Sequence, residues 1–532
     1  MSQSKKQSFL HGTVLLAMAT AIVKVVGAFY KIPLNAIIGE QGFSYFNTAY
    51  EIYGVLTTIS VAGLPLAMSR MISEASALGH HNQVRRIYNT ARALFLSMGA
   101  AGSLLMTLFC RELAQFQEQP DAWAAIACLG PCMFLICVMA AYRGFFQGQS
   151  NMLPTATSQV LESICKLIVG IVAAITILKL TDSIPLAAGG AILGVTASCL
   201  LSVCYLSSCF RKSKRALPES SDPVDSYWRT AKDLLAIAIP VTIGSAGLSV
   251  LSVLETKIYM GQLLATGNTQ LQADTMKGIY DMTKTIFNMP SAFIPTITIS
   301  IIPAITAQLT LKDYHAARSI EESAIRITGL ICAPCTIGLV VMARPVTALL
   351  GGYGGDNLNL ATVLMTILGS SILFSAMSVV TNSIMQSHGH PNLPVINMFI
   401  GGVLKLVAVY VLTSNPHIGI LGAPIGALLG YAIIMLLNIF TLRRCVTEPP
   451  AILRNLGRSA LAALIMGIFV ALTRFGLERI LGSSGHWLLL CAVPIVVGIC
   501  VYFFAAIKLK AITRTDCLLL PKGEKIANLL HL

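Results

Sequence analysis

The residues with the clearest chemical potential in this 532-residue chain are charged side chains that interrupt long apolar segments. Six are lysines and four are acids: Lys24, Lys31, Lys166, Lys257, Lys284, Lys405, Glu51, Glu162, Glu255 and Asp281. A charge at the centre of a bilayer costs about 2.5 to 3.5 kcal/mol even on a lenient insertion scale. Such residues therefore pair with one another or line a polar cavity. Six cations against four acids predict a net cationic interior, which suits an anionic ligand.

The spacing of these residues separates two roles. Lys24 and Lys31 are seven residues apart, so they share one face of a helix, and Lys24 has no acid on its own helix. We therefore expect Lys24 to face an anion. Glu162 and Lys166 are four residues apart and can form a structural pair along their helix.

For the other charged residues three roles stay open: pairing with a neighbouring charge, snorkelling to the membrane surface, or lining a cavity. Asp281 stands three residues before Lys284, and Glu255 and Lys257 lie near the outer end of their segment.

The sequence offers no catalytic or metal-binding constellation inside the apolar segments. The nine histidines fall in loops or near segment ends, and most of the fourteen cysteines are scattered through apolar stretches without histidine nearby. We predict that the chain is not an enzyme and holds no metal or cofactor. A membrane glycosyltransferase or acyltransferase is the alternative from the enzyme class.

Composition shows which elements must position these charges. Apolar residues make up 55% of the chain and charged residues 11%, whereas soluble domains carry about 25% charged residues. The chain therefore belongs in a membrane. Fourteen spanning helices are predicted, at residues 12–38, 46–70, 91–110, 122–146, 155–178, 185–209, 233–260, 278–306, 323–343, 359–386, 395–414, 418–442, 457–477 and 485–507.

The distribution of basic residues predicts the orientation. With the N-terminus inside, 25 of the 37 lysines and arginines fall in cytoplasmic segments or helix ends, while six fall outside, Lys277 among them. The positive-inside rule then puts both termini in the cytoplasm. Orientation also explains the net charge of +14 without nucleic acid. The cluster from Arg211 to Arg215 could in addition attract anionic membrane lipids.

A weak internal repeat divides the chain into halves. Tyr50-Glu51 stands fifteen residues before Pro65, and Tyr280-Asp281 stands fifteen before Pro295, an offset of 230 residues. We predict a six-helix lobe over 1–209, a cytoplasmic linker over 210–232, a second lobe over 233–442, two more spans within 443–507 and a cytoplasmic tail over 508–532. Pro65 and Pro295 are candidate hinges, since proline bends spanning helices.

Two motifs resemble a known family. They are Gly63-Leu-Pro-Leu-Ala-Met-Ser69 with Ser73-Glu74, and Arg143-Gly-Phe-Phe-Gln-Gly148 with Asn151 to Gln159 and Glu162. Both resemble the stage V sporulation protein B and polysaccharide-export branch of the multidrug/oligosaccharidyl-lipid/polysaccharide (MOP) flippase superfamily. The resemblance covers essentially the whole chain. It implies two six-helix lobes in a V, with two further helices, in a bacterial plasma membrane.

The resemblance also implies a substrate class, namely undecaprenyl-linked sugars such as lipid II or a polysaccharide precursor. In the related MurJ-type flippases basic residues line the central cavity, and Lys24 looks like the counterpart of one of them. Lys31 is a looser match, and Thr57 and Thr58 stand where that pattern has an arginine pair. The expected pyrophosphate site is Lys24, Lys31 and Lys284.

The expected function is alternating-access transport of this lipid-linked anionic glycan, with a coupling cation or the membrane potential as candidate energy sources. The alternative is a multidrug or cation antiporter of the same fold (MATE-like). Glu51, Glu255, Lys257 and Asp281 are the candidate cavity and ion-coupling charges, and in an antiporter Glu51, Glu255 or Asp281 would exchange a proton or sodium ion. A net acidic cavity would favour this alternative, and the charge count opposes it.

Overall fold

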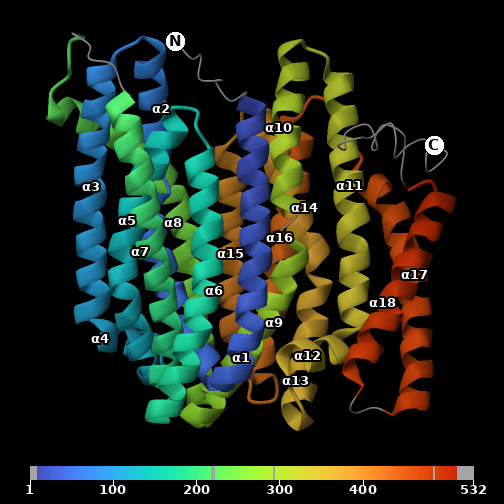
Figure 1. The fold of residues 1–532 in the computed structure, drawn as a ribbon. Coiled ribbons are helices and arrows are strands. Elements are labelled where there is room, and N and C mark those ends of the chain that lie inside the picture. The colour runs from blue at the N-terminus through green and yellow to red at the C-terminus, as the bar shows by residue number, and fades with distance from the viewer. Residues whose placement is uncertain (1–8, 217–221, 292–293, 483–485, 512–532) are drawn as a thin grey trace. The chain divides into compact units, whose positions relative to one another are not determined.

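All regular structure in the described part of the chain is helical. The computed structural model describes residues 9–216, 222–291, 294–482 and 486–511. The helices of the first half are α1 (Phe9–Val61), α2 (Leu64–Ala77), α3 (His81–Leu108), α4 (Cys110–Phe116), η1 (Pro120–Ala122), α5 (Trp123–Gly148), α6 (Leu153–Thr181), α7 (Ile184–Ala216), α8 (Tyr227–Ala265) and α9 (Gln270–Ser291). Those of the second half are α10 (Ile294–Thr310), α11 (Tyr314–Val341), α12 (Ala343–Gly351), α13 (Gly355–Ser370), α14 (Ile372–Ser387), α15 (Asn392–Thr413), η2 (Gly419–Leu421), α16 (Gly422–Cys445), α17 (Ile452–Leu481) and α18 (Trp487–Lys508) (Figure 1).

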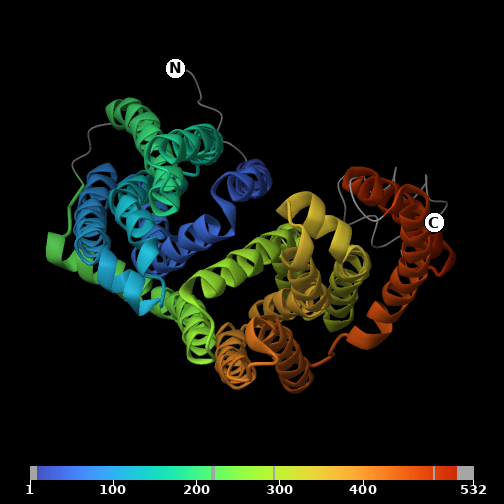
Figure 2. The ribbon, with the colours of Figure 1, turned by 90° about the horizontal axis from the view of Figure 1, so that it is seen from below.

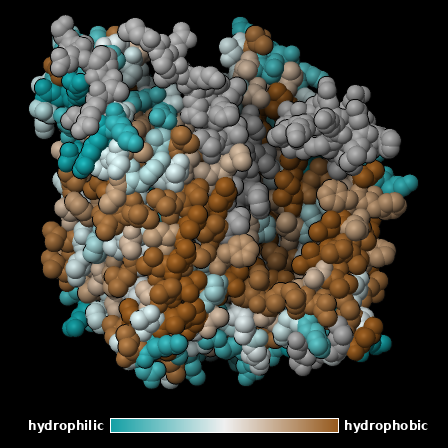
Figure 3. Space-filling view, in the orientation of Figure 1, coloured by the Kyte–Doolittle hydropathy of each residue, from teal (hydrophilic) through white to brown (hydrophobic). Residues whose placement is uncertain are grey.

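The helices have the length and composition of membrane spans. Among the described residues, twelve are long and apolar enough to cross a bilayer. The fourteen predicted spans all fall on helices. The first two fall on the continuous stretch α1–α2, and the eighth falls on the described residues of α9 and α10. On the face drawn in Figure 3, apolar residues cover the middle of each unit and hydrophilic residues gather toward the top and bottom. The all-helical, multi-pass membrane fold is confirmed.

A glycine separates the first two predicted spans. Gly39 interrupts α1 with φ 69° and ψ 179°, a conformation that residues with a Cβ rarely adopt. The first predicted span ends at residue 38, directly before this kink. The glycine therefore lets one long helix turn where the sequence predicts a connection.

The predicted repeat pairs the segment around Pro65 with the segment around Pro295. α1 ends at Val61 and α2 begins at Leu64. Pro65 is the second residue of α2, where its missing N–H removes no helical hydrogen bond. Residues 292–293, which correspond to Ala62 and Gly63, lie outside the described part, as does the side chain of Pro295. The hinge role assigned to both prolines stays a prediction.

The described chain packs as two compact units, Met1–Asp281 and Met282–Leu532. In the first unit α8 packs against α1, α2 and α3. A Cβ added to Gly63 would lie 2.1 Å from the carbonyl oxygen of Ala238, so α2 and α8 touch backbone to backbone. The units thus do not coincide with the predicted lobes, whose boundaries stay a prediction. Most of the predicted cytoplasmic tail lies outside the described residues.

The second unit is a helical bundle flanked by a helix pair. α17 and α18 lie side by side, and α17 packs against α11 (Figure 2). Inside the bundle Asn438 of α16 donates to Thr381 (2.9 Å) and Asn382 (2.8 Å) of α14, and Asn397 of α15 donates to Asn438 (2.9 Å). Buried amides that satisfy one another in this way fix the register of three helices.

Candidate functional site

The two family-like motifs pack directly against each other. The Ser73 hydroxyl of α2 donates to the Gly148 carbonyl of α5 at 2.8 Å. A Cβ on Gly148 would lie 2.7 Å from the Cβ of Ile72, so only glycine allows this approach. Gly144, one turn earlier, is buried against Met68 and Pro65. The motifs therefore form one helix–helix contact near the predicted cytoplasmic ends of α2 and α5.

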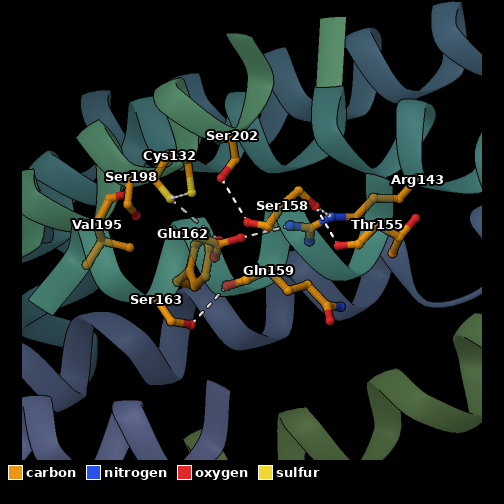
Figure 4. Close-up of polar contacts among 12 residues, drawn as sticks. Cys132, Arg143, Thr155, Ser158, Gln159, Glu162, Ser163, Val195, Ser198 and Ser202 are labelled. Carbon is orange, nitrogen blue, oxygen red and sulfur yellow. Dashed lines mark hydrogen bonds and ion pairs between the residues drawn. The ribbon is translucent and has the colours of Figure 1, made fainter. Parts of the chain in front are cut away.

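Arg143 of the second motif organises a polar cluster between α5 and α6 (Figure 4). Its Nε donates to Ser158 Oγ at 3.0 Å, and its Nη2 lies 2.9 Å from Glu162 Oε2. Both side chains are largely buried, at 16% and 22% exposure. Ser202 of α7 donates to the Ser158 carbonyl at 3.1 Å, so the cluster ties three helices together.

This cluster corrects the predicted Glu162–Lys166 pair. Glu162 is ion-paired with Arg143 of the neighbouring helix, while the Lys166 ammonium lies 5.7 Å from the ring centroid of Tyr30 in α1. Sequence spacing identifies partners only along one helix. Here a partner from a second helix reaches the carboxylate with a guanidinium, which suits carboxylates geometrically.

The predicted anion-binding lysines occupy different settings. Lys31 is half-buried, donates to Asn47 Oδ1 at 2.9 Å and lies 5.9 Å from the ring centroid of Phe43. Lys284 is half-buried in the second unit and has an interaction partner. The side chain of Lys24 lies outside the described part, although its backbone belongs to α1. The assignment of these three lysines to a pyrophosphate stays a prediction.

Asp281 pairs with a lysine that the predicted topology places outside the membrane. Lys277 Nζ lies 2.6 Å from Asp281 Oδ2, one helical turn away, and the side chains are 0% and 2% exposed. Lys277 is therefore a buried residue of α9 and not a solvent-facing basic residue of an outer segment. Its charge is neutralised inside the first unit.

The other predicted cavity charges lie on α1 and α8. Glu255 is buried, Glu51 is half-buried, and each has a partner. Lys257 lies 3.8 Å from the ring centroid of Phe116, a close cation–π contact. Their role as cavity or ion-coupling charges stays a prediction. No group of three or more His, Cys, Asp or Glu residues in the described part could hold a metal ion.

A second polar cluster, which the sequence did not predict, joins α1, η1 and α9. Asp274 is buried and accepts from Tyr45 Oη at 3.1 Å, Gln119 Nε2 at 2.7 Å and Gln270 Nε2 at 3.0 Å. Gln119 also bonds to Ser44 and Thr48. We call this set of residues the Asp274 network. It lies at the predicted outer ends of its helices, before the predicted span 278–306.

Burial and hydrogen bonding act on Asp274 in opposite directions. Burial raises the pKa of its carboxyl above the ordinary value, and the three donors and Lys277 offset part of that rise. Close backbone packing adjoins the network, because a Cβ on Gly278 would lie 1.8 Å from the Glu40 carbonyl oxygen. The signal available in the sequence was the presence of Ser44, Asn47 and Thr48 near the start of an apolar segment.

Comparison with known proteins identifies the family. The model of the family described as polysaccharide biosynthesis protein matches residues 9–308, which contain both motifs, the Arg143 cluster and the Asp274 network. The chain belongs to that family. The MOP-superfamily resemblance drawn from the motifs is confirmed.

Curated relatives of this family member match over most of their length. Stage V sporulation protein B of Bacillus subtilis (strain 168) is 26% identical over 445 residues, covering 82% of this chain and 84% of that protein. Lipid II flippase MurJ of the same organism is 22% identical over 526 residues, covering 94% and 95%.

Solved structures show that the family member shares its fold with two kinds of transport protein. Lipid II flippase MurJ in an inward closed conformation superposes with a TM-score of 0.66, at 13% identity, covering 93% of this chain and 98% of that chain. An inward-facing multidrug resistance MATE family transporter of the MOP superfamily also gives 0.66, at 14% identity, covering 80% and 98%.

Proposed function

We propose that this protein is a flippase that carries an undecaprenyl-pyrophosphate-linked sugar, either lipid II or a polysaccharide precursor, across the bacterial plasma membrane by alternating access. The observation that carries the proposal is the family match over residues 9–308, which spans every charged residue assigned to the cavity. Both termini and the linker 210–232 would lie in the cytoplasm.

The chemistry of the first helix supports an anionic substrate. The Lys31 ammonium donates to the neutral amide oxygen of Asn47 and lies near the ring of Phe43. Lys24 stands seven residues earlier in the sequence of α1. A pyrophosphate drawn out of water needs such cations to offset its lost hydration.

The MATE-like antiporter is the second candidate, because the solved MATE and MurJ structures superpose equally well. The acids it would use include Asp281. In the structure that carboxylate lies against the Lys277 ammonium, an arrangement that favours neutralisation over binding of a transported cation. We therefore prefer the flippase.

Reconstitution of the full chain in liposomes tests the choice. A fluorescent undecaprenyl-pyrophosphate oligosaccharide is placed in one leaflet, and its accessibility to an impermeant quencher is followed with and without a membrane potential or an ion gradient. Time-dependent loss of protection that requires the protein supports the flippase. Absence of lipid movement together with proton- or sodium-driven efflux of a cationic dye would establish the antiporter.

A further inference from the structure

A strongly basic recess lies in the second unit, and none of the residues assigned to transport lines it. It has a volume of about 500 Å³ and is formed by the first turns of α11 and α17, with Ala511 after α18 at its edge. Its charged lining consists of Arg318 and Arg326 of α11, Arg454 and Arg458 of α17, and one acid, Glu322. His315 also lines it, so four permanent cations face a single carboxylate.

Side-chain contacts hold the recess in shape. Glu322 Oε1 accepts from Arg318 Nε and from the backbone N–H of Ala451, both at 3.1 Å, which fixes the start of α17 against α11. Arg326 donates to Asn455 Oδ1 at 3.1 Å and to Ser323 Oγ at 2.7 Å. Glu322, the one acid of the lining, is therefore engaged in contacts that hold α11 and the start of α17 together.

Two of the arginines, Arg454 and Arg458, keep unused donors. A guanidinium carries five N–H groups, and Arg458 uses one of them on the Lys510 carbonyl at 3.1 Å. Arg454 makes no hydrogen bond or ion pair with any residue of the described ranges, and it is exposed. Arginine N–H groups in this number and planar geometry match the oxygens of a phosphate group.

The positive-inside rule explains why basic residues lie at these helix ends, but it does not require two helices to bring four arginines into one recess with a single acid.

The surface next to the recess indicates the rest of the ligand. Leu461, Ile468 and Leu472 of α17 are 48%, 60% and 64% exposed and follow Arg454 at helical spacing along one face. Within the described second unit that face is apolar and uncovered, as expected where a helix contacts lipid chains.

We propose that this recess binds the phosphate of an anionic membrane lipid at the cytoplasmic surface, with the lipid chains along the Leu461–Leu472 face of α17. Anionic phospholipids and polyprenyl phosphates share this chemistry. The recess is a second lipid site, independent of the lysines proposed to hold the transported pyrophosphate.

Native mass spectrometry of the full chain, delipidated in neutral detergent, tests the proposal. Separate titrations use phosphatidylglycerol, undecaprenyl phosphate, phosphatidylcholine and inorganic phosphate. The key variant is Arg454→Ala/Arg458→Ala, and the matched control is Arg229→Ala/Lys232→Ala, which removes two exposed basic residues from the predicted cytoplasmic end of α8. Arg454→Lys/Arg458→Lys keeps the charge but loses the planar donors.

The key variant should bind phosphatidylglycerol or undecaprenyl phosphate about thirtyfold more weakly, and the Lys variant should recover part of this loss. The control should stay within about twofold of the parent chain. Whichever lipid shows the larger loss identifies the source of the phosphate. Three results would overturn the proposal. They are equal losses of lipid affinity in the key and control variants, unchanged lipid binding in the key variant, and binding of inorganic phosphate as tight as that of lipid. Thermal melting of each variant in the same detergent identifies any variant that is misfolded, and the Lys pair then provides the test.

Discussion

Lys277 and Asp281 form an ion pair of 2.6 Å that is completely removed from solvent within α9. Position 277 lies 230 residues after Asn47, and Asp281 lies 230 after Glu51. The two repeat-related segments thus carry polar residues at the same two positions of their helices. In the first, Asn47 accepts from Lys31, and in the second Lys277 supplies the cation itself.

Removing one member of this pair should be more damaging than removing both. Lys277→Met should lower the free energy of unfolding by about 3 to 5 kcal/mol, because it leaves a buried carboxylate without its cation. Lys277→Met/Asp281→Leu should recover much of that loss. Thermal unfolding in detergent measures both, and a double variant no more stable than the single one would contradict the expectation.

The Arg143 cluster makes a matched pair of predictions on neighbouring helices. Arg143→Ala should destabilise the protein by about 2 to 3 kcal/mol, since Glu162 loses its guanidinium in a largely buried site. Lys166→Ala should cost about 1 kcal/mol or less, because only a cation–π contact with Tyr30 is lost. The two variants are compared by thermal melting of the full chain. A larger loss of stability in Lys166→Ala than in Arg143→Ala would indicate that Glu162 pairs with Lys166, as the sequence spacing predicts.

Close packing next to the Asp274 network should make Gly278 intolerant of a side chain. Gly278→Ala drives a Cβ into the Glu40 carbonyl and should cost about 1 to 3 kcal/mol. Gly476→Ala in α17 is the control, since its Cβ would meet no atom within 4 Å. That control should stabilise the helix by about 0.5 to 1 kcal/mol. Similar melting temperatures for both variants would show that α1 and α9 separate easily at this point.

The anion role of Lys24 gives a prediction about transport. Lys24→Ala should abolish lipid movement in the liposome assay without lowering the melting temperature, and Lys24→Arg should retain a measurable fraction because it keeps the charge. Full activity of Lys24→Ala would remove Lys24 from the substrate site.

The predicted orientation can be tested with cysteine probes on the described surface. Val224→Cys, in the linker, should resist an impermeant maleimide applied to intact cells and react after permeabilisation. Lys179→Cys, at the predicted outer end of α6, should react in both cases. The parent chain provides the background from native cysteines. Labelling of Val224→Cys in intact cells would reverse the topology.

The elements of this fold were predictable because apolar segments of about 20 residues have few alternatives to spanning helices. The 230-residue repeat was equally accessible, because the residues that define it stand in the sequence itself. Charge partners were not. Glu162 pairs across helices with Arg143, and periodicity along one helix carries no information about a neighbouring helix.

The burial of Lys277 and the Asp274 network were not predicted, and both have the same physical cause. Lys277 stands near the end of an apolar segment, where a buried cation and a solvent-facing one have the same sequence signature. The Asp274 network relies on Tyr45, Gln119 and Gln270, and uncharged polar residues near a span end are too common to indicate a contact. Only the packing of α9 against α1 brings their hydrogen-bonding groups together.

The hydrogen bond from Tyr45 to Asp274 joins residues 229 positions apart, which has a consequence for biogenesis. At about 5 to 20 residues per second, roughly 10 to 50 s pass between synthesis of the donor and synthesis of its acceptor. During that interval the ribosome delivers α1 to α8 to the membrane while Ser44, Tyr45 and Gln119 still lack Asp274. A nascent chain halted before α9 would therefore expose an incomplete polar surface, a natural target for membrane chaperones and quality-control proteases.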